Sequence, residues 1–229
     1  MSKLNIKKIL NTTLLTAVLS WLWIKRKRTV VPAEKIAKKF LVKKSGSIQT
    51  DQLLEQYRKN YKDLCLHFAL PKDRVLQFHL RSAILPVLAF YQVLLPMNKG
   101  DRETTIAEIT EVVRDWILRM TRNFLVPLRY IPDPFRLFKP GFDIVMKLFP
   151  PSGFDTRYLE KSEERIAFDI NRCFYLNTLT RYGVPELTTV FCAADEAMAE
   201  LFPSSIEFQR TQTLGRGGSH CDFQYCNKS

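Results

Sequence analysis

Residues 165–225 read RIAFDINRCFYLNTLTRYGVPELTTVFCAADEAMAELFPSSIEFQRTQTLGRGGSHCDFQY. Along 165–171, apolar residues alternate with polar or small ones, which is typical of a half-buried β-strand. Two helices are predicted next. The first covers about 173–182 and ends at Gly183, and the second is opened by Pro185 and ends before Pro203.

The last part of this stretch predicts a β-hairpin. Residues 206–214 and 221–225 both alternate in hydrophobicity, and the glycine-rich loop 215–219 lies between them. The predicted order is strand–helix–helix–strand–strand. The C-terminal part is therefore expected to be a β-α-α-β-β unit with a small antiparallel sheet.

The preceding half is expected to be helical, which makes the chain a mostly helical α+β protein. Asp101 is placed to cap the best-defined helix, and apolar residues from Ile106 to Met120 recur on one stripe of it. The predicted helices are 30–44, 52–68, 72–95 with an interruption at Pro86, and 101–124.

Residues 124–154 differ in composition from the rest of the chain, because they hold six Phe and six Pro with Arg and Lys between them. One interpretation is a set of short, proline-broken helices whose phenylalanines fill the core. A substrate lid or a membrane-facing surface is the alternative.

The positive charge of the chain is concentrated at its N-terminus. The net charge is +12, but residues 1–49 hold 12 basic residues and one acidic residue, whereas residues 50–229 hold 23 and 22. A nearly neutral domain with a basic extension does not favour nucleic acid as a partner. The expected organisation is an anchor at 1–28, a basic helix and linker at 29–48, and the main domain at 49–229.

The N-terminal extension contains an uncharged run, Ile9–Ile24, which Lys25–Arg28 follows directly. As a helix it would span ~24 Å, less than the ~30 Å core of a bilayer. A membrane anchor is one interpretation, with the domain on the cytoplasmic side. An amphipathic helix packed on the domain and a cleaved signal are the others.

The chain has five cysteines, an odd number that does not indicate a disulfide framework. We expect free thiols in a reducing compartment. On the predicted last strand, Cys221 faces one side while His220 and Asp222 face the other. On the preceding helix, Cys192 and Asp195 are three residues apart and share a face.

These residues belong to a longer pattern. An Arg-Cys pair at 172–173 is followed by GVPEL, CAAD, RTQTL and GSHCDF, which end at Phe223. The stretch from about 75 to 225 resembles the L-2-amino-thiazoline-4-carboxylic acid hydrolase family. The resemblance implies hydrolytic opening of a cyclic, isothiourea-like C=N bond to give a carbamoyl-cysteine.

Such a reaction needs a nucleophile, a proton donor and a cation for the substrate carboxylate. The resemblance makes Cys221 the candidate nucleophile, with Asp195, His220 and Asp222 as further catalytic candidates. Carboxylate or substrate binding is assigned to Arg210, Arg172 and Cys192. We expect Cys221 to line a pocket with Asp195 and at least one of these two arginines.

Other functions stay open at this point. The chain could be a non-catalytic ligand-binding or scaffold protein, or a cyclase or isomerase for an apolar substrate, which the phenylalanines of 124–154 would favour. For a hydrolase, the expected partners are a small-molecule substrate, in a biosynthetic pathway, and a membrane surface at the N-terminus. No metal or other cofactor is assigned, since the Cys173, Cys192, Cys221 and His220 set lacks the usual ligand spacing.

Overall fold

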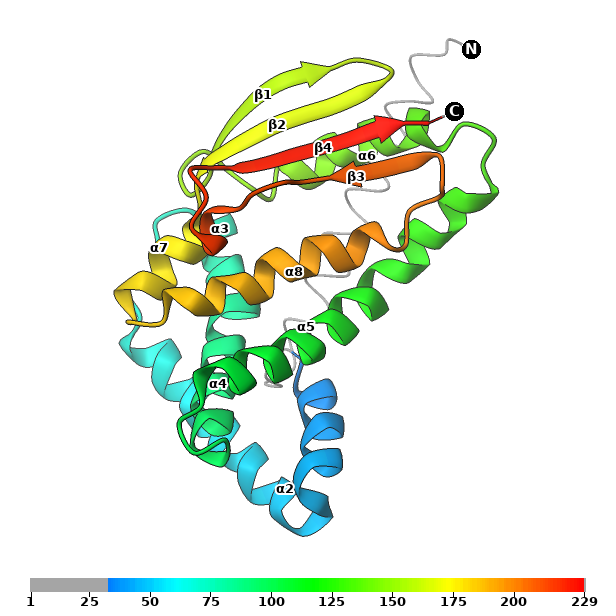
Figure 1. The fold of residues 1–229 in the computed structure, drawn as a ribbon. Coiled ribbons are helices and arrows are strands. Elements are labelled where there is room, and N and C mark those ends of the chain that lie inside the picture. Colours follow the sequence, from blue (N-terminus) through cyan, green and yellow to red (C-terminus); the bar gives the residue numbers. More distant parts are fainter. Residues whose placement is uncertain (1–32, 229) are drawn as a thin grey trace. The chain divides into compact units, whose positions relative to one another are not determined.

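The computed structural model describes residues 33–228. The extension expected to anchor the chain, 1–28 with its run Ile9–Ile24, lies outside the described residues. The described part has a helical half and a C-terminal α+β half (Figure 1). The mostly helical α+β class predicted from the sequence is confirmed.

The helical half is built on α2 (Glu34–His67), α4 (Leu85–Met97) and α5 (Arg102–Leu125). Gly46 has a φ of 75° and kinks α2 at the linker expected from the sequence. Tyr57 of α2 packs edge-on against Phe90 of α4, with ring centroids 5.5 Å apart. The Asp101 carboxylate accepts the Thr104 N–H and caps α5 as predicted.

Before α4, the chain forms α3 (Arg74–His79) and the π-helical turn η2 (Leu80–Ile84). This turn leads into Pro86, which stands in the first turn of α4, where its missing N–H is tolerated. Within residues 33–228, the stretch Arg74–Met97 is long and apolar enough to cross a membrane, but 61% of its most apolar window is buried. We therefore describe it as a core helix.

The residues from 124 to 154 form η3 (Val126–Tyr130) and α6 (Pro134–Met146). Phe135, Phe138 and Phe142 of α6 are buried against the sheet, so the core interpretation holds for them. Phe124, by contrast, is 59% exposed.

The sheet has four antiparallel strands in the order β1-β2-β4-β3. These are β1 (Asp155–Lys161), β2 (Arg165–Arg172), β3 (Ile206–Gln209) and β4 (Cys221–Asn227). The predicted hairpin pairing is present, with Phe208 opposite Tyr225. The edge strand β1 was not predicted, because its sequence DTRYLEK is mostly exposed and lacks a clear alternation.

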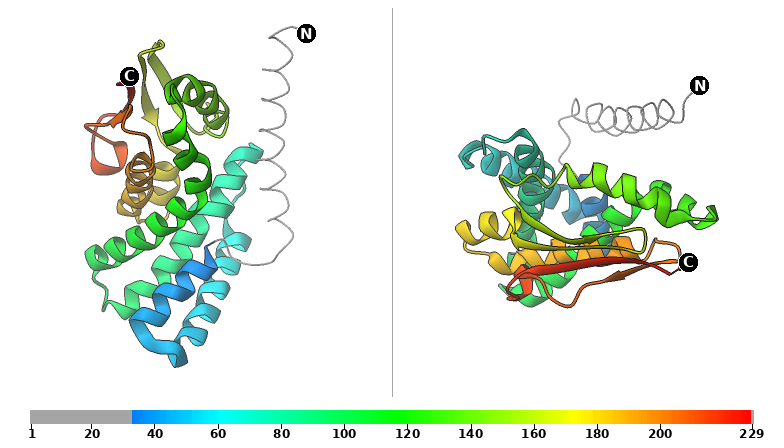
Figure 2. Two further views of the ribbon diagram at one scale, coloured as in Figure 1. Left: turned by 90° about the vertical axis from the view of Figure 1, so that its right-hand side faces the viewer. Right: turned by 90° about the horizontal axis from the view of Figure 1, so that it is seen from above.

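Between β2 and β3 lie α7 (Phe174–Arg181), the short turn η4 (Pro185–Leu187) and α8 (Thr188–Ala199). The two views in Figure 2 place α6 on one face of the sheet and α8 beneath the β3–β4 side. The aromatic core lies between α6 and the sheet, where Phe168 and Phe223 stack with ring centroids 5.0 Å apart.

Candidate functional site

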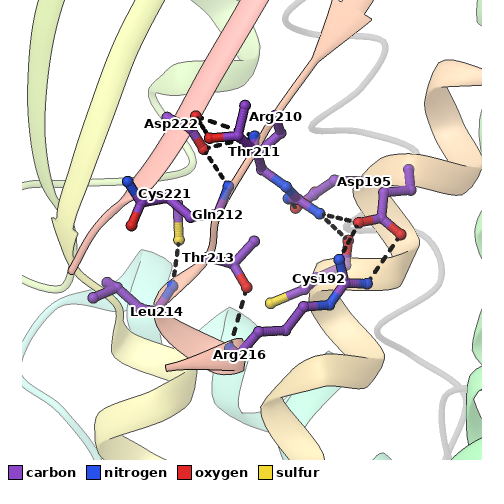
Figure 3. A network of polar contacts seen from close by, with 11 residues as sticks. Cys192, Asp195, Arg210, Thr211, Gln212, Thr213, Leu214, Arg216, Cys221 and Asp222 are labelled. Carbon is purple, nitrogen blue, oxygen red and sulfur yellow. Dashed lines mark hydrogen bonds and ion pairs between the residues drawn. The ribbon is translucent and has the colours of Figure 1, made fainter. Parts of the chain in front are cut away.

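The candidate site is built by the connection between β3 and β4, residues 210–220, which lies against α8 (Figure 3). The connection is extended to Thr213 and then forms the single turn η5 (Leu214–Arg216). The Thr213 hydroxyl accepts the Arg216 N–H, and Gly217 follows with a φ of 85°, a conformation that favours glycine.

Asp222 holds the start of this loop in place. Its carboxylate accepts the Thr211 and Gln212 N–H groups, at 3.0 and 2.7 Å, and the Thr211 hydroxyl at 2.6 Å. Burial acts to raise the pKa of Asp222, but these hydrogen bonds outweigh it and lower the pKa. Asp222 is therefore an ionised acceptor that shapes the loop.

Arg210 joins the sheet to α8. Its side chain is 2% exposed, and its guanidinium lies 5.1 Å from the centre of the Phe223 ring. The same guanidinium donates to Asp195 at 2.9 Å, to Glu196 at 2.8 Å and to the Cys192 carbonyl at 2.8 Å. These contacts occupy the cation, so it has little capacity left for a substrate carboxylate.

The two acids on α8 differ in how easily they ionise. Burial raises the pKa of Asp195 to about 6, although Arg210 acts in the opposite direction. For Glu196, hydrogen bonds from Arg216 and Arg210 outweigh burial and lower the pKa. A third of the Asp195 side chain is exposed, so water reaches this carboxyl. Both properties suit a general acid–base group.

The thiols near the loop are buried. Cys221 is 7% exposed, and its sulfur accepts the Leu214 N–H at 3.2 Å. Burial raises the pKa of Cys221 to about 11, that of Cys173 to about 12, and also that of Cys192. Thiols with such pKa values are almost entirely protonated at neutral pH, so this geometry does not supply a thiolate. The nucleophilic role of Cys221 stays a prediction.

His220 and Arg172 lie apart from the Arg210–Asp195 pair. His220 directly precedes β4, with Nδ1 2.9 Å from the Ser219 hydroxyl and Nε2 3.6 Å from the Asp169 carboxylate of β2. Arg172, at the end of β2, donates to the Pro151 carbonyl at 2.6 Å. The structure brings together Arg210, Asp195, Cys192 and, through the loop, Asp222 and Cys221.

A pocket of about 330 Å³ opens within the loop, and its lining contains Arg210 but not Cys221, Asp195 or Arg172, so Cys221 and Asp195 do not share this pocket, contrary to the expectation from the sequence. Arg216 lies in its wall and is half exposed, with Glu196 as its ion-pair partner at 2.8 Å. Sequence reasoning did not single out Arg216, although it is the one charged residue of the segment 213–219. The pocket is lined by Arg210, Thr211, Gln212, Thr213, Arg216, Gly217 and Gly218.

Two close approaches explain the glycines of this loop. A Cβ on Gly215 would lie 2.9 Å from the Cys192 sulfur, and one on Gly218 would lie 2.8 Å from the Gln212 side-chain oxygen. Residues 33–228 contain no group of three His, Cys, Asp or Glu side chains arranged to hold a metal ion. The loop is thus shaped by packing and hydrogen bonds among its own residues and α8.

Comparison with known proteins adds the family. The model of the L-2-amino-thiazoline-4-carboxylic acid hydrolase family matches residues 77–225, from α3 to β4. The chain belongs to this family. The match confirms the assignment made from the sequence motifs, and it includes the whole 210–220 loop of this hydrolase-family protein.

Other comparisons are more distant. No curated protein matches the chain significantly. Among solved structures, an unliganded Fe(II) H-NOX protein from K. algicida has 12% identity and a TM-score of 0.42, over 86% of this chain and 95% of that one. A mutant H-NOX protein from S. oneidensis in the Fe(II) ligation state has 13% identity and a TM-score of 0.39, over 86% and 96%.

Proposed function

We propose that this hydrolase-family protein hydrolyses a C–N bond of a small cyclic amidine that carries a carboxylate, in the pocket of the 210–220 loop. The family name makes L-2-amino-thiazoline-4-carboxylic acid the first substrate to test. The observation that carries the proposal is a half-exposed cation in the pocket wall, Arg216, together with an acid of pKa about 6, Asp195, which is ion-paired to the pocket residue Arg210.

Arg216 is the proposed partner of the substrate carboxylate. It donates two hydrogen bonds to the Glu196 carboxylate, at 2.8 and 3.1 Å, and both side chains are about half exposed, so a substrate carboxylate would have to replace Glu196 on the guanidinium. The planar guanidinium donates two parallel hydrogen bonds to a carboxylate. Arg210, which is buried and held by two acids, is the positioning residue of the site.

Asp195 is the proposed general base. Its carboxylate removes one proton from a water molecule, and the water oxygen forms a bond to the amidine carbon. Asp195 then passes this proton to the ring nitrogen. The new hydroxyl gives up its own proton to the same nitrogen as the C=O bond forms, and the ring C–N bond breaks to release the nitrogen as an amine. At pH 7 a carboxyl of pKa about 6 is mostly ionised and is still basic enough to take part.

The test is turnover by the purified full-length chain. We expect a product heavier than the substrate by one water, detected by mass spectrometry. In Arg216→Gln we expect a raised KM and therefore a lower kcat/KM. Arg119→Gln, which removes an exposed arginine paired to Asp115 on α5, is the matched control and should behave as the wild type. Absence of turnover with this substrate and its close cyclic analogues would refute the proposal.

A second candidate is ligand binding without catalysis. It is favoured by the extent to which Arg210, Asp222 and Cys221 are committed to holding the loop and the sheet. Calorimetry distinguishes the two functions, because a binding protein would give a saturable heat with the same compound and no product. In that case Arg216→Gln should weaken binding.

We also propose that residues 1–28 bring the chain to a membrane, with the domain on the cytoplasmic side. The support is the uncharged run Ile9–Ile24 beside the four basic residues Lys25–Arg28. Deletion of 1–28 should move the protein from the membrane fraction to the soluble fraction. A full-length chain that does not fractionate with membranes would contradict this.

A further inference from the structure

The C-terminal half of α5 and η3 are apolar in sequence but poorly buried. Residues 114–133 include ten residues of the types Trp, Ile, Leu, Met, Phe, Val and Tyr, yet none of the twenty is fully buried. Phe124 is 59% exposed and Tyr130 is 85% exposed. Figure 1 shows this part of α5 leading away from α2 and α4 toward α6. The other eight apolar residues are half-buried, so Phe124 and Tyr130 carry most of the exposed apolar surface of this stretch.

α6 continues the same surface with its outer side. Phe135, Phe138 and Phe142 face the core and Met146 packs against it, but Leu137 and Val145 do not. Leu137 and Val145 are 52% and 50% exposed, and helical spacing places Gly141 and Ile144 on the same outer stripe. The helix is therefore apolar over a wider arc than the core covers.

Positive charge borders this apolar surface. Residues 114–147 contain seven basic and three acidic residues. The side chains of Arg122, Arg136 and Lys147 form no ion pair or hydrogen bond with any other residue of the described range 33–228. Unpaired cations beside exposed aromatic and aliphatic side chains are the composition of an interfacial membrane-binding surface.

We propose that the C-terminal half of α5, η3 and the outer face of α6, together the 114–147 surface, dock on a bilayer containing anionic phospholipid. The position of Ala33, the first described residue, supports a bilayer as the partner of this surface. Ala33 lines the same small apolar groove as Trp116 of α5, and four residues separate it from the basic run Lys25–Arg28. The surface and the predicted N-terminal membrane segment are thus joined by at most ~18 Å of chain.

The first test is sedimentation of the full-length chain with phosphatidylcholine vesicles that contain about 30% phosphatidylserine, on the order of physiological anionic content. In the triple variant Arg122→Gln, Arg136→Gln, Lys147→Gln we expect the partition coefficient to fall on the order of 100-fold, since each cation near the surface contributes about fivefold. The matched control removes the same charge elsewhere, as Lys59→Gln, Lys62→Gln, Arg181→Gln. An equal fall in both triple variants would overturn the proposal.

The second test locates the contact in the full-length chain, even when the N-terminus also binds. Hydroxyl-radical footprinting should show that anionic vesicles protect Phe124, Tyr130 and Leu137 from oxidation, while Tyr182, which follows α7, stays reactive. Unchanged reactivity of these three residues in vesicle-bound protein would overturn the proposal. So would protection that grows with protein concentration without vesicles, because a second copy of the chain would then be the occupant.

Discussion

Nη1 of Arg210 lies 2.9 Å from Oδ2 of Asp195, and this ion pair fastens the end of β3 to α8. The arginine side chain is 2% exposed and the aspartate side chain is 33% exposed. The buried partner therefore holds in place a carboxyl that water can reach, which is an arrangement expected of a positioned acid–base group.

Replacing Arg210 by Met should destabilise the fold, because it leaves Asp195 and Glu196 without their shared cation. We expect a loss of about 3 kcal/mol in the free energy of unfolding, measured by urea denaturation. Arg119→Met removes an exposed ion pair and should cost less than about 1 kcal/mol. A loss for Arg210→Met as small as that of the control would show that the pair does not hold the site.

Gly215→Ala should distort the loop, because the added Cβ would lie 2.9 Å from the Cys192 sulfur and 3.1 Å from Thr188. We expect a loss of about 1–3 kcal/mol in stability and a weaker affinity for substrate. Adding Cys192→Ala to this variant should restore part of the lost stability and part of the lost affinity for substrate. Gly141→Ala is the control, since nothing lies within 4 Å of its Cβ position, and it should not destabilise.

His79 should make the fold less stable in mild acid. The ring is buried, with Nε2 2.5 Å from the Leu148 carbonyl and Nδ1 2.7 Å from the Tyr175 hydroxyl. Burial lowers the pKa of His79 below its ordinary value of 6.5, so below that pH the unfolded chain binds a proton that the folded chain does not. Stability therefore falls as the pH drops through 6.5.

The measurement is urea unfolding between about pH 7.5 and 5.5, on either side of the ordinary histidine pKa, for the wild type and His79→Gln. The variant loses two hydrogen bonds and should be less stable at the upper pH, but its stability should fall less on acidification. Equal falls in the two proteins would contradict the assignment.

The pH dependence of turnover tests the state of Asp195. A general base must be ionised, so kcat/KM should be constant above the pKa of about 6 and fall tenfold per pH unit well below it. A profile that instead rises toward pH 11, where the Cys221 thiol ionises, would indicate thiolate chemistry.

The strands that could be predicted are those with one buried face. β2 and β4 alternate because Ile166, Phe168 and Phe223 all face the core. β1 lies at the edge of the sheet with Leu159 57% exposed, so its sequence carries no such pattern. The full length of α2 was also not predicted. Two separate helices were expected, but the helical conformation resumes after Gly46.

The composition of the site was easier to predict than the role of each residue. Helical spacing placed Cys192 and Asp195 on one face of α8, and strand alternation placed His220 opposite Cys221, whereas Arg210 was named from the family resemblance. The sequence alone does not show which of the two arginine side chains, Arg210 or Arg216, is buried. Arg210 is buried by Phe223 and α8, whereas Arg216, six residues later, is half exposed. That difference is decided by tertiary packing, and it moves the proposed carboxylate contact from Arg210 to Arg216.

The most direct test compares Asp195→Asn with Cys221→Ala in the turnover assay, with folding of both variants checked by circular dichroism. The acid–base account predicts that Asp195→Asn lowers kcat by at least about 100-fold. It also predicts that Cys221→Ala, which loses one hydrogen bond to Leu214, keeps kcat within about threefold of the wild type. Loss of turnover in folded Cys221→Ala with activity retained in Asp195→Asn would contradict the account and make the thiol the nucleophile.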